Sequence, residues 1–535
     1  MTNFGRDLIL KINRPQYAPN PEVFISAMAW RLVDETLISG WVRIVNSDPK
    51  KRKNIALIYE TTPLDSEPRD LKYITTRPDH GEEALLRWRQ SLEDNELSFE
   101  PNVKDGARSI ADALRGVSIE KSKRQAATPL SPHIALLQNS RGIFAKNSPP
   151  DFALIIEQLF ALGNLSRAAD PAQPVVVSDS AIGLWYVAMR KRLRFDWLLS
   201  QIDRSIKGSI ENHPLNQPRI NETKPLFPDV DDEASVLVPR MEYMEKLSTI
   251  NLGPNTPFAW FNDAWRNLTD EKWLKALPAR RWVDWATTVL RMAFGFAYIW
   301  EAAWYQALAS AITSPSTEFN HEEKCLYGVH AGAKNSERID LDFVLCTSKL
   351  TNHIAMPWKD ADLGVSFRDV ASTVRLALSR GLKIRQILDA AIQELPEMSI
   401  EETLYELRKN DRVKKELTDA LKEKYLNQTK SLYEAVKYTL LIRNQNGESA
   451  DFYGLLKTVK PRFTIIEPAT EWIAAISSLA INTPGGHGSL GTLRTSLERL
   501  GLRPTVAELT RYLEVAGLAE SAADADTAVA LVSAY

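Results

Sequence analysis

Apolar residues recur at intervals of three and four positions along most of this chain, which is the spacing of one face of an α-helix. The segment 282–304, WVDWATTVLRMAFGFAYIWEAAW, is the clearest case, because apolar residues fill one helical face and large ones occupy the other faces too. A helix that is apolar nearly all round is typical of the centre of a helical domain. We therefore expect segment 282–304 to be buried core.

Two other interpretations of this segment fail on its charges. A membrane span needs about 20 consecutive apolar residues, and Asp284, Arg291 and Glu301 interrupt the run. A platform for stacking bases needs exposed rings with cations beside them, and Arg291 is the one cation inside the segment. A hydrophobic docking surface for a partner subunit remains as an alternative to the core.

Helical periodicity also predicts helices over 151–165, 180–202 and 367–395, and a long charged helical region over 399–444. The last of these opens with Ser399 and Glu402, which have the spacing of a capping box. Near the N-terminus, GWVRIVN (40–46) and NIALIYETT (54–62) are rich in branched residues and flank a basic turn. These two runs predict a pair of strands.

Two stretches without regular patterning, 117–133 and the proline-rich 211–235, mark linkers or boundaries, and the glycine-rich 482–492 predicts a flexible joint. The expected parts are an α+β N-terminal domain (1–116), a helical segment (134–207), a central helical domain with a short strand near 338–346 (236–481), and a C-terminal helical module (489–535).

The C-terminal module is expected to contain helices over 490–502 and 505–518 and a final strand within 524–535, with Thr505 and Glu508 as a second capping box. This order of elements resembles part of a winged-helix module. The preceding GHGSLGT (486–492) has the glycine spacing of a phosphate-binding loop but carries Thr492 where the lysine belongs. The fold class expected for the whole chain is mainly α: a large multi-helix body with a small α+β N-terminal portion and this compact C-terminal module.

The 535 residues carry a net charge of −2, so no global positive field attracts nucleic acid, and any such contact needs a local patch. Two cysteines fit a reducing compartment. The first residues lack the apolar core of a signal peptide. We expect a bacterial cytoplasmic protein with no membrane contact.

Four local basic clusters stand out, near 50–53, 121–124, 190–194 and 414–424. The strongest candidate for binding nucleic acid combines Arg190, Lys191, Arg192 and Arg194 on one predicted helix. Trp185, Tyr186 and Trp197 lie nearby in the sequence, and basic residues with aromatic ones are typical of a groove that follows a nucleic-acid backbone. The alternative is a helix whose cations face water while its rings pack underneath.

An enzymatic alternative is a metal-dependent nuclease of the restriction type. Such enzymes hold a metal with an Asp on one strand and Glu-x-Lys on the next. The candidate residues here are Glu337, Asp340, Asp342, Lys349 and Lys359. Met356 and Trp358 stand where a metal-binding acid is expected, so the resemblance is partial.

Other catalytic or metal-binding patterns are weaker. The group His321, Cys325, His330, Cys346 and His353 has ligand types that suit zinc, but it lacks zinc-site spacing. No G-x-S-x-G elbow is present. The sequence thus favours a non-catalytic scaffold or adaptor subunit, without a cofactor, that contacts protein partners and DNA in a multi-protein system such as phage defence or DNA processing. A degenerate nuclease and a purely structural interaction subunit are the alternatives.

Overall fold

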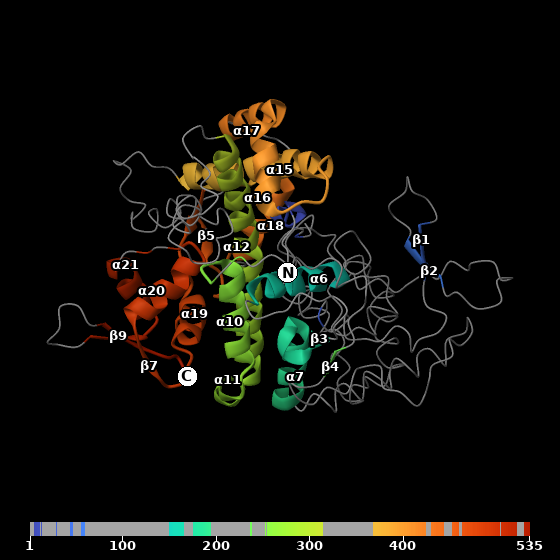
Figure 1. Cartoon of the computed structure of the whole chain (residues 1–535). Coiled ribbons are helices and arrows are strands. Elements are labelled where there is room, and N and C mark those ends of the chain that lie inside the picture. Colours follow the sequence, from blue (N-terminus) through green and yellow to red (C-terminus); the bar gives the residue numbers. More distant parts are fainter. Residues whose placement is uncertain are drawn as a thin grey trace, which may run out of the picture.

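One long helix, α12 (Ala279–Thr313), runs through the centre of the protein in the computed structural model (Figure 1). The described part of the chain is mainly helical, as predicted. The structure describes residues 5–10, 12, 28, 43–46, 55–58, 149–164, 175–193, 236–237, 252, 254–313, 367–423, 430–442, 452–459, 463–502, 504, 506–521 and 529–535.

Helix α12 contains the tryptophan-rich segment and buries it. Trp282, Trp285, Trp300 and Trp304 are each at most 1% exposed. The prediction that this segment is core is therefore confirmed. No described helix combines the length and the apolar character that crossing a bilayer requires.

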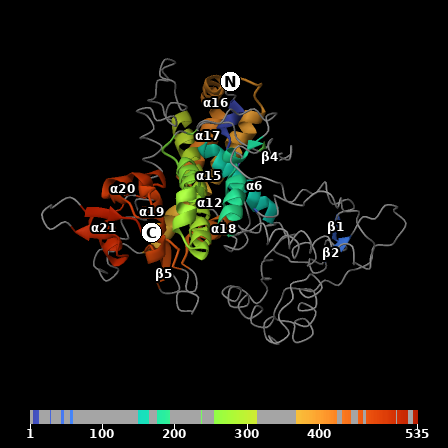
Figure 2. The same cartoon turned by 90° about the horizontal axis from the view of Figure 1, so that it is seen from below.

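Helices from distant parts of the sequence surround α12. On one side lie α6 (Pro149–Gly163), α7 (Ala181–Leu193), α10 (Pro257–Thr269) and α11 (Glu271–Ala276). Toward its C-terminal end lie α15 (Phe367–Gln393), α16 (Ile400–Lys409), α17 (Asp411–Lys422) and α18 (Lys430–Leu440) (Figures 1 and 2). The helices predicted from periodicity are thus present, and the capping box of Ser399 and Glu402 forms at the start of α16.

The three charges within the aromatic segment of α12 connect it to its neighbours. Arg291 is buried and donates to the carbonyl oxygens of Thr439 and Leu441, both at 2.7 Å, at the C-terminal end of α18. Glu301 is buried and forms an ion pair of 3.1 Å with Arg385 of α15. Asp284 accepts a hydrogen bond of 3.4 Å from the hydroxyl of Tyr453. The three charged residues that interrupt this apolar segment therefore make structural contacts with neighbouring elements.

An N-terminal segment that includes a 3₁₀ turn, η1 (Gly5–Leu8), packs into this core. The backbone N–H of Leu10 donates to the hydroxyl of Tyr305 at 2.9 Å, and the indole N–H of Trp304 donates to the carbonyl of Leu8 at 3.1 Å. Leu8 and Leu10 are fully buried. Residues from the start of the sequence thus complete the packing around the C-terminal half of α12.

The described strands form small antiparallel sheets. The predicted N-terminal pair is confirmed as β1 (Arg43–Asn46) and β2 (Ile55–Ile58). Two further pairs are β3 (Val175–Val176) with β4 (Val236–Leu237), and β5 (Leu456–Val459) with β6 (Phe463–Ile466). A second 3₁₀ turn, η3 (Val177–Asp179), leads into α7. The strand expected near 338–346 lies outside the described residues.

The C-terminal module begins with α19 (Thr470–Ile481), which packs on α10 and α12. It continues through β7 (His487–Ser489), α20 (Leu490–Arg499), α21 (Val506–Val515), β8 (Ala519–Ser521) and β9 (Val529–Val532). The three strands form one antiparallel sheet in the order β7-β9-β8.

The expected flexible joint at 482–492 is instead built into this module. Asn482 ends α19 in the left-handed conformation, with φ of 58°. Strand β7 follows and pairs with β9, and the Ser489 side chain then caps α20 by accepting from the N–H of Thr492 at 3.1 Å. The glycine-rich composition gave no sign of β7, because its pairing partner lies more than 40 residues further along the chain.

Candidate functional site

Helix α7 carries the predicted basic cluster on a rigid support. A buried carboxylate on α6, Glu157, holds the start of this helix. It accepts hydrogen bonds from the hydroxyl of Ser180 at 2.7 Å and from the backbone N–H of Ile182 at 2.8 Å. Negative charge is stabilising at a helix N-terminus, so Glu157 fixes where α7 begins. The indole N–H of Trp265 on α10 also donates to the carbonyl of Ala181 at 2.8 Å.

The cations and rings of this cluster lie in different environments. Lys191 is exposed, and Arg190 is half-buried with its guanidinium 5.7 Å from the centre of the Tyr186 ring. Trp185 and Tyr186 are buried in the core, so these two rings follow the alternative of packing beneath the helix and do not line a groove. The side chain of Arg192, and all of Arg194 and Trp197, lie outside the described residues. Lys191 therefore reaches solvent, and the two described rings of this cluster serve as packing.

Helix α11 brings further lysines next to α7. Its Trp273 is fully buried, whereas Lys272 and Lys275 are exposed on its outer side. Lys275 forms an ion pair of 2.6 Å with Glu271. The hydrogen bond and charge of Lys275 hold the pKa of Glu271 below its ordinary value, and the charge of Lys191 contributes in the same direction. The sequence did not predict that α11 belongs to this site, because its lysines come close to Lys191 only when α11 packs against α7.

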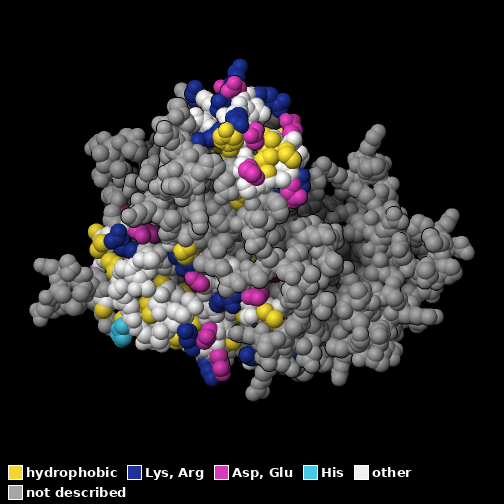
Figure 3. Space-filling model, in the orientation of Figure 1, with side chains coloured by type: hydrophobic (Ala, Val, Ile, Leu, Met, Phe, Trp, Pro, Cys, Tyr) yellow, Lys and Arg dark blue, Asp and Glu magenta, His cyan; other side chains and the backbone are white. Residues whose placement is uncertain are grey.

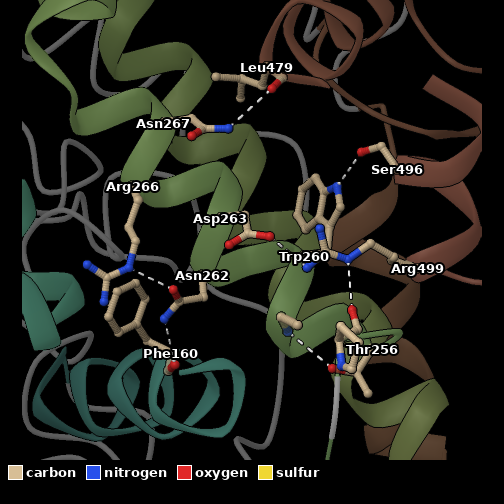
Figure 4. A network of polar contacts seen from close by, with 12 residues as sticks. Phe160, Thr256, Trp260, Asn262, Asp263, Arg266, Asn267, Leu479, Ser496 and Arg499 are labelled. Atoms are coloured by element: carbon tan, nitrogen blue, oxygen red, sulfur yellow. Dashed lines mark hydrogen bonds and ion pairs between the residues drawn. The ribbon is translucent and has the colours of Figure 1, made fainter. Parts of the chain in front are cut away.

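Helix α10 joins the C-terminal module to the rest of the body through a polar network (Figure 4). On one side, the indole N–H of Trp260 donates to the hydroxyl of Ser496 at 3.1 Å, and Arg499 forms an ion pair of 2.8 Å with Asp263. On the other side, the side-chain amide of Asn262 donates to the carbonyl of Phe160 on α6 at 3.1 Å. These polar side chains connect α10 to α20 and to α6. The network therefore stabilises the fold.

The C-terminal module presents α21 at the outer edge of the protein (Figures 1 and 2). Leu509 and Leu513 are buried inside the module, whereas Val506 is 50% and Val515 is 70% exposed. Burial raises the pKa of Tyr512 on this helix to about 12, and this hydroxyl therefore stays neutral at physiological pH. Figure 3 shows hydrophobic side chains at the surface on the edge of the molecule where α21 lies.

The residues of the nuclease alternative, Glu337, Asp340, Asp342, Lys349 and Lys359, lie outside the described residues, as does the histidine and cysteine group of 321–353. Within the described ranges, no group of three or more His, Cys, Asp or Glu side chains could hold a metal ion. The buried charges Glu157, Arg291 and Glu301 all bond to protein groups and stabilise helix ends or helix contacts.

Comparisons with known proteins add no family to this description. No family model matches the chain, and neither a curated protein nor a solved structure matches it.

Proposed function

We propose that this protein is a non-catalytic scaffold or adaptor subunit of a bacterial multi-protein system, in phage defence or DNA processing, and that it contacts DNA through the basic end of α7. The observation that carries this proposal is the placement of Arg190 and Lys191 on a helix whose opposite side is fixed in the core by Glu157 and Trp265. Because the helix backbone is already fixed in the core, binding of phosphate groups by these cations costs little backbone freedom.

The use of the buried charges supports a non-catalytic role. Catalytic groups are typically titratable residues in a cleft with perturbed pKa values. Here Arg291 and Glu301 hold helices together, and Glu157 caps one. These three buried charges thus serve the packing of the described core, which supports a chain that contributes surfaces to an assembly.

The proposal predicts salt-sensitive DNA binding by the full chain. Changing Arg190, Lys191, Arg192 and Arg194 together to alanine should weaken binding by about 100-fold at about 0.1 M salt, because each lost phosphate contact removes a counterion-release contribution. Fluorescence anisotropy with a labelled duplex, repeated from about 50 to 200 mM salt, measures this loss.

A matched control removes four exposed cations that lie outside all four basic clusters: Lys409→Ala, Arg412→Ala, Arg494→Ala and Arg511→Ala. Equal loss in both variants would show a general charge effect and contradict the proposed contact. DNA cleavage by the wild type in Mg²⁺ or Mn²⁺ that Asp340→Ala removes would favour the nuclease alternative instead.

A second candidate function, docking of a protein partner, is favoured by the C-terminal module. Its order of elements, helix-strand-helix-helix-strand-strand, and its sheet order β7-β9-β8 are those of a winged-helix module with α21 as the presented helix. The module from α19 onward, residues 470–535, holds four arginines against seven acidic residues, a balance of −3 that disfavours phosphate binding. Val506 and Val515 are exposed at the two ends of α21, nine residues apart and therefore on opposite sides of the helix. They suit a partner that contacts both ends of α21 through apolar groups and carries basic groups around them.

This second candidate predicts that Val506→Glu with Val515→Glu releases one specific component of the native complex. Burying two carboxylates in an apolar contact is unfavourable, so retention should fall at least about 10-fold. Quantitative affinity purification with the tagged full chain compares the variant with Tyr405→Glu, an equally exposed site on α16. Unchanged composition in the α21 variant would refute docking through this helix.

A further inference from the structure

We infer that α7 and α11 together form one phosphate-binding surface for the backbone of double-stranded nucleic acid. This inference rests on the proposed DNA contact and defines its extent and its ligand. The surface consists of Arg190 and Lys191 at the end of α7 and Lys272 and Lys275 on α11. We call these four residues the α7–α11 surface.

Helices α7 and α11 lie next to each other in the fold. Helix α11 packs directly against α7, although about 80 residues separate them in the sequence. The buried Trp273 sets the rotation of α11, which leaves Lys272 and Lys275 facing outward. Lys191 lies close enough to act electrostatically on Glu271 of α11. Two separate stretches of sequence therefore supply one group of surface cations.

The described residues of the α7–α11 surface include more cations than carboxylates. Among the described residues of α7 and α11, these four cations lie beside two carboxylates, Glu271 of α11 and its capping residue Asp270. Asp270 accepts from the N–H of Lys272 at 3.0 Å as the helix cap, and Glu271 pairs with Lys275. Within the described part of the chain, no ion pair joins Lys191 or Lys272 to a carboxylate at contact distance. The surface thus keeps a positive balance that a row of phosphates can neutralise.

The α7–α11 surface suits double-stranded nucleic acid better than a single strand. Single-strand-binding surfaces stack bases on exposed rings. The aromatic residues of α7 and α11, namely Trp185, Tyr186 and Trp273, are all buried. Lysine and arginine contacts to phosphates position a nucleic acid without reading its sequence. A duplex offers one negative charge per about 1.7 Å of axis, which is denser than a single strand. We therefore expect sequence-independent binding of duplex in preference to single strand.

The test uses the full chain and a labelled duplex of about 30 base pairs with an arbitrary sequence. Lys272→Ala with Lys275→Ala should weaken binding about 10-fold or more at about 0.1 M salt, and should reduce the slope of log affinity against log salt by about 1.8. The charge-preserving pair Lys272→Arg with Lys275→Arg should retain binding. The control Lys409→Ala with Arg412→Ala removes the same charge from exposed positions on α16 and α17 that lie outside the basic clusters. Thermal melting checks that all variants are folded.

The outcomes separate this inference from the proposed function. If the α7 variant loses binding while Lys272→Ala with Lys275→Ala matches the control pair Lys409→Ala with Arg412→Ala, α11 takes no part and the inference is wrong, although the DNA contact stands. If the wild type shows no salt-dependent binding, the proposed DNA contact itself fails. Tighter binding of a single strand than of the duplex of equal length would overturn the assignment of the ligand.

Discussion

Replacing Arg291 by methionine is expected to lower the free energy of unfolding by about 3 kcal/mol. The guanidinium donates to the carbonyl oxygens of Thr439 and Leu441, both at 2.7 Å, where water does not reach. Methionine refills most of the volume but donates no hydrogen bond. The buried carbonyls at the end of α18 would then lose these donors, and an unsatisfied buried acceptor costs about 1–3 kcal/mol.

Urea-induced unfolding followed by tryptophan fluorescence measures this loss. Arg408 offers a matched control, because its guanidinium donates to the carbonyl of Ala311 at 3.1 and 2.6 Å from a half-buried position. Water can replace that donor, so Arg408→Met should cost about 1 kcal/mol. If the two variants lost equal unfolding free energy, the burial of Arg291 and its acceptor carbonyls would not explain the loss.

Replacing Gly381 by alanine is expected to destabilise the protein by about 3 kcal/mol, even though alanine is the better helix former by about 1 kcal/mol. A Cβ atom at this position of α15 would lie 2.6 Å from the Cα and 2.8 Å from the Cβ of Ala302 on α12. The backbone of α12 cannot rotate away as a long side chain can. The two helices would have to separate along their contact.

The control for Gly381 is Gly491→Ala in the first turn of α20. A Cβ atom there meets only the hydroxyl of Ser489, at 3.5 Å. This substitution should be neutral or stabilising by up to about 1 kcal/mol, because it lowers the entropy of the unfolded chain. Opposite signs for the two variants in thermal or urea unfolding would confirm that helix contact requires Gly381. A neutral Gly381→Ala would contradict the close approach of α15 to α12.

Much of the fold follows from local patterns in the sequence. The apolar residues around 282–304 and the capping box of Ser399 depend on positions three and four residues apart, and both are confirmed. Strand β7 depends on a partner far along the chain, and its glycine-rich sequence predicted a joint instead. The packing of Leu8 and Leu10 on α12 is likewise non-local, so no local pattern could predict it.

The candidate site was predictable only in part. The run of cations near Arg190 marks the exposed end of α7, and the structure places Lys191 at the surface as expected. Composition could not decide whether Trp185 and Tyr186 face solvent, because rings beside cations occur both in grooves and beneath solvated helices. The contribution of Lys272 depends on how α11 packs against α7, which the sequence does not encode locally.

The N-terminal segment has a consequence for biosynthesis. Leu10 leaves the ribosome 295 residues before Tyr305, whose hydroxyl binds its backbone. At a translation rate of about 5–20 residues per second, the interval is roughly 15 to 60 seconds. During this interval Leu8, Ile9 and Leu10 lack the α12 surface that buries them in the finished protein. The nascent chain therefore displays an apolar stretch that chaperones can shield, and folding yield should depend on how quickly α12 is made.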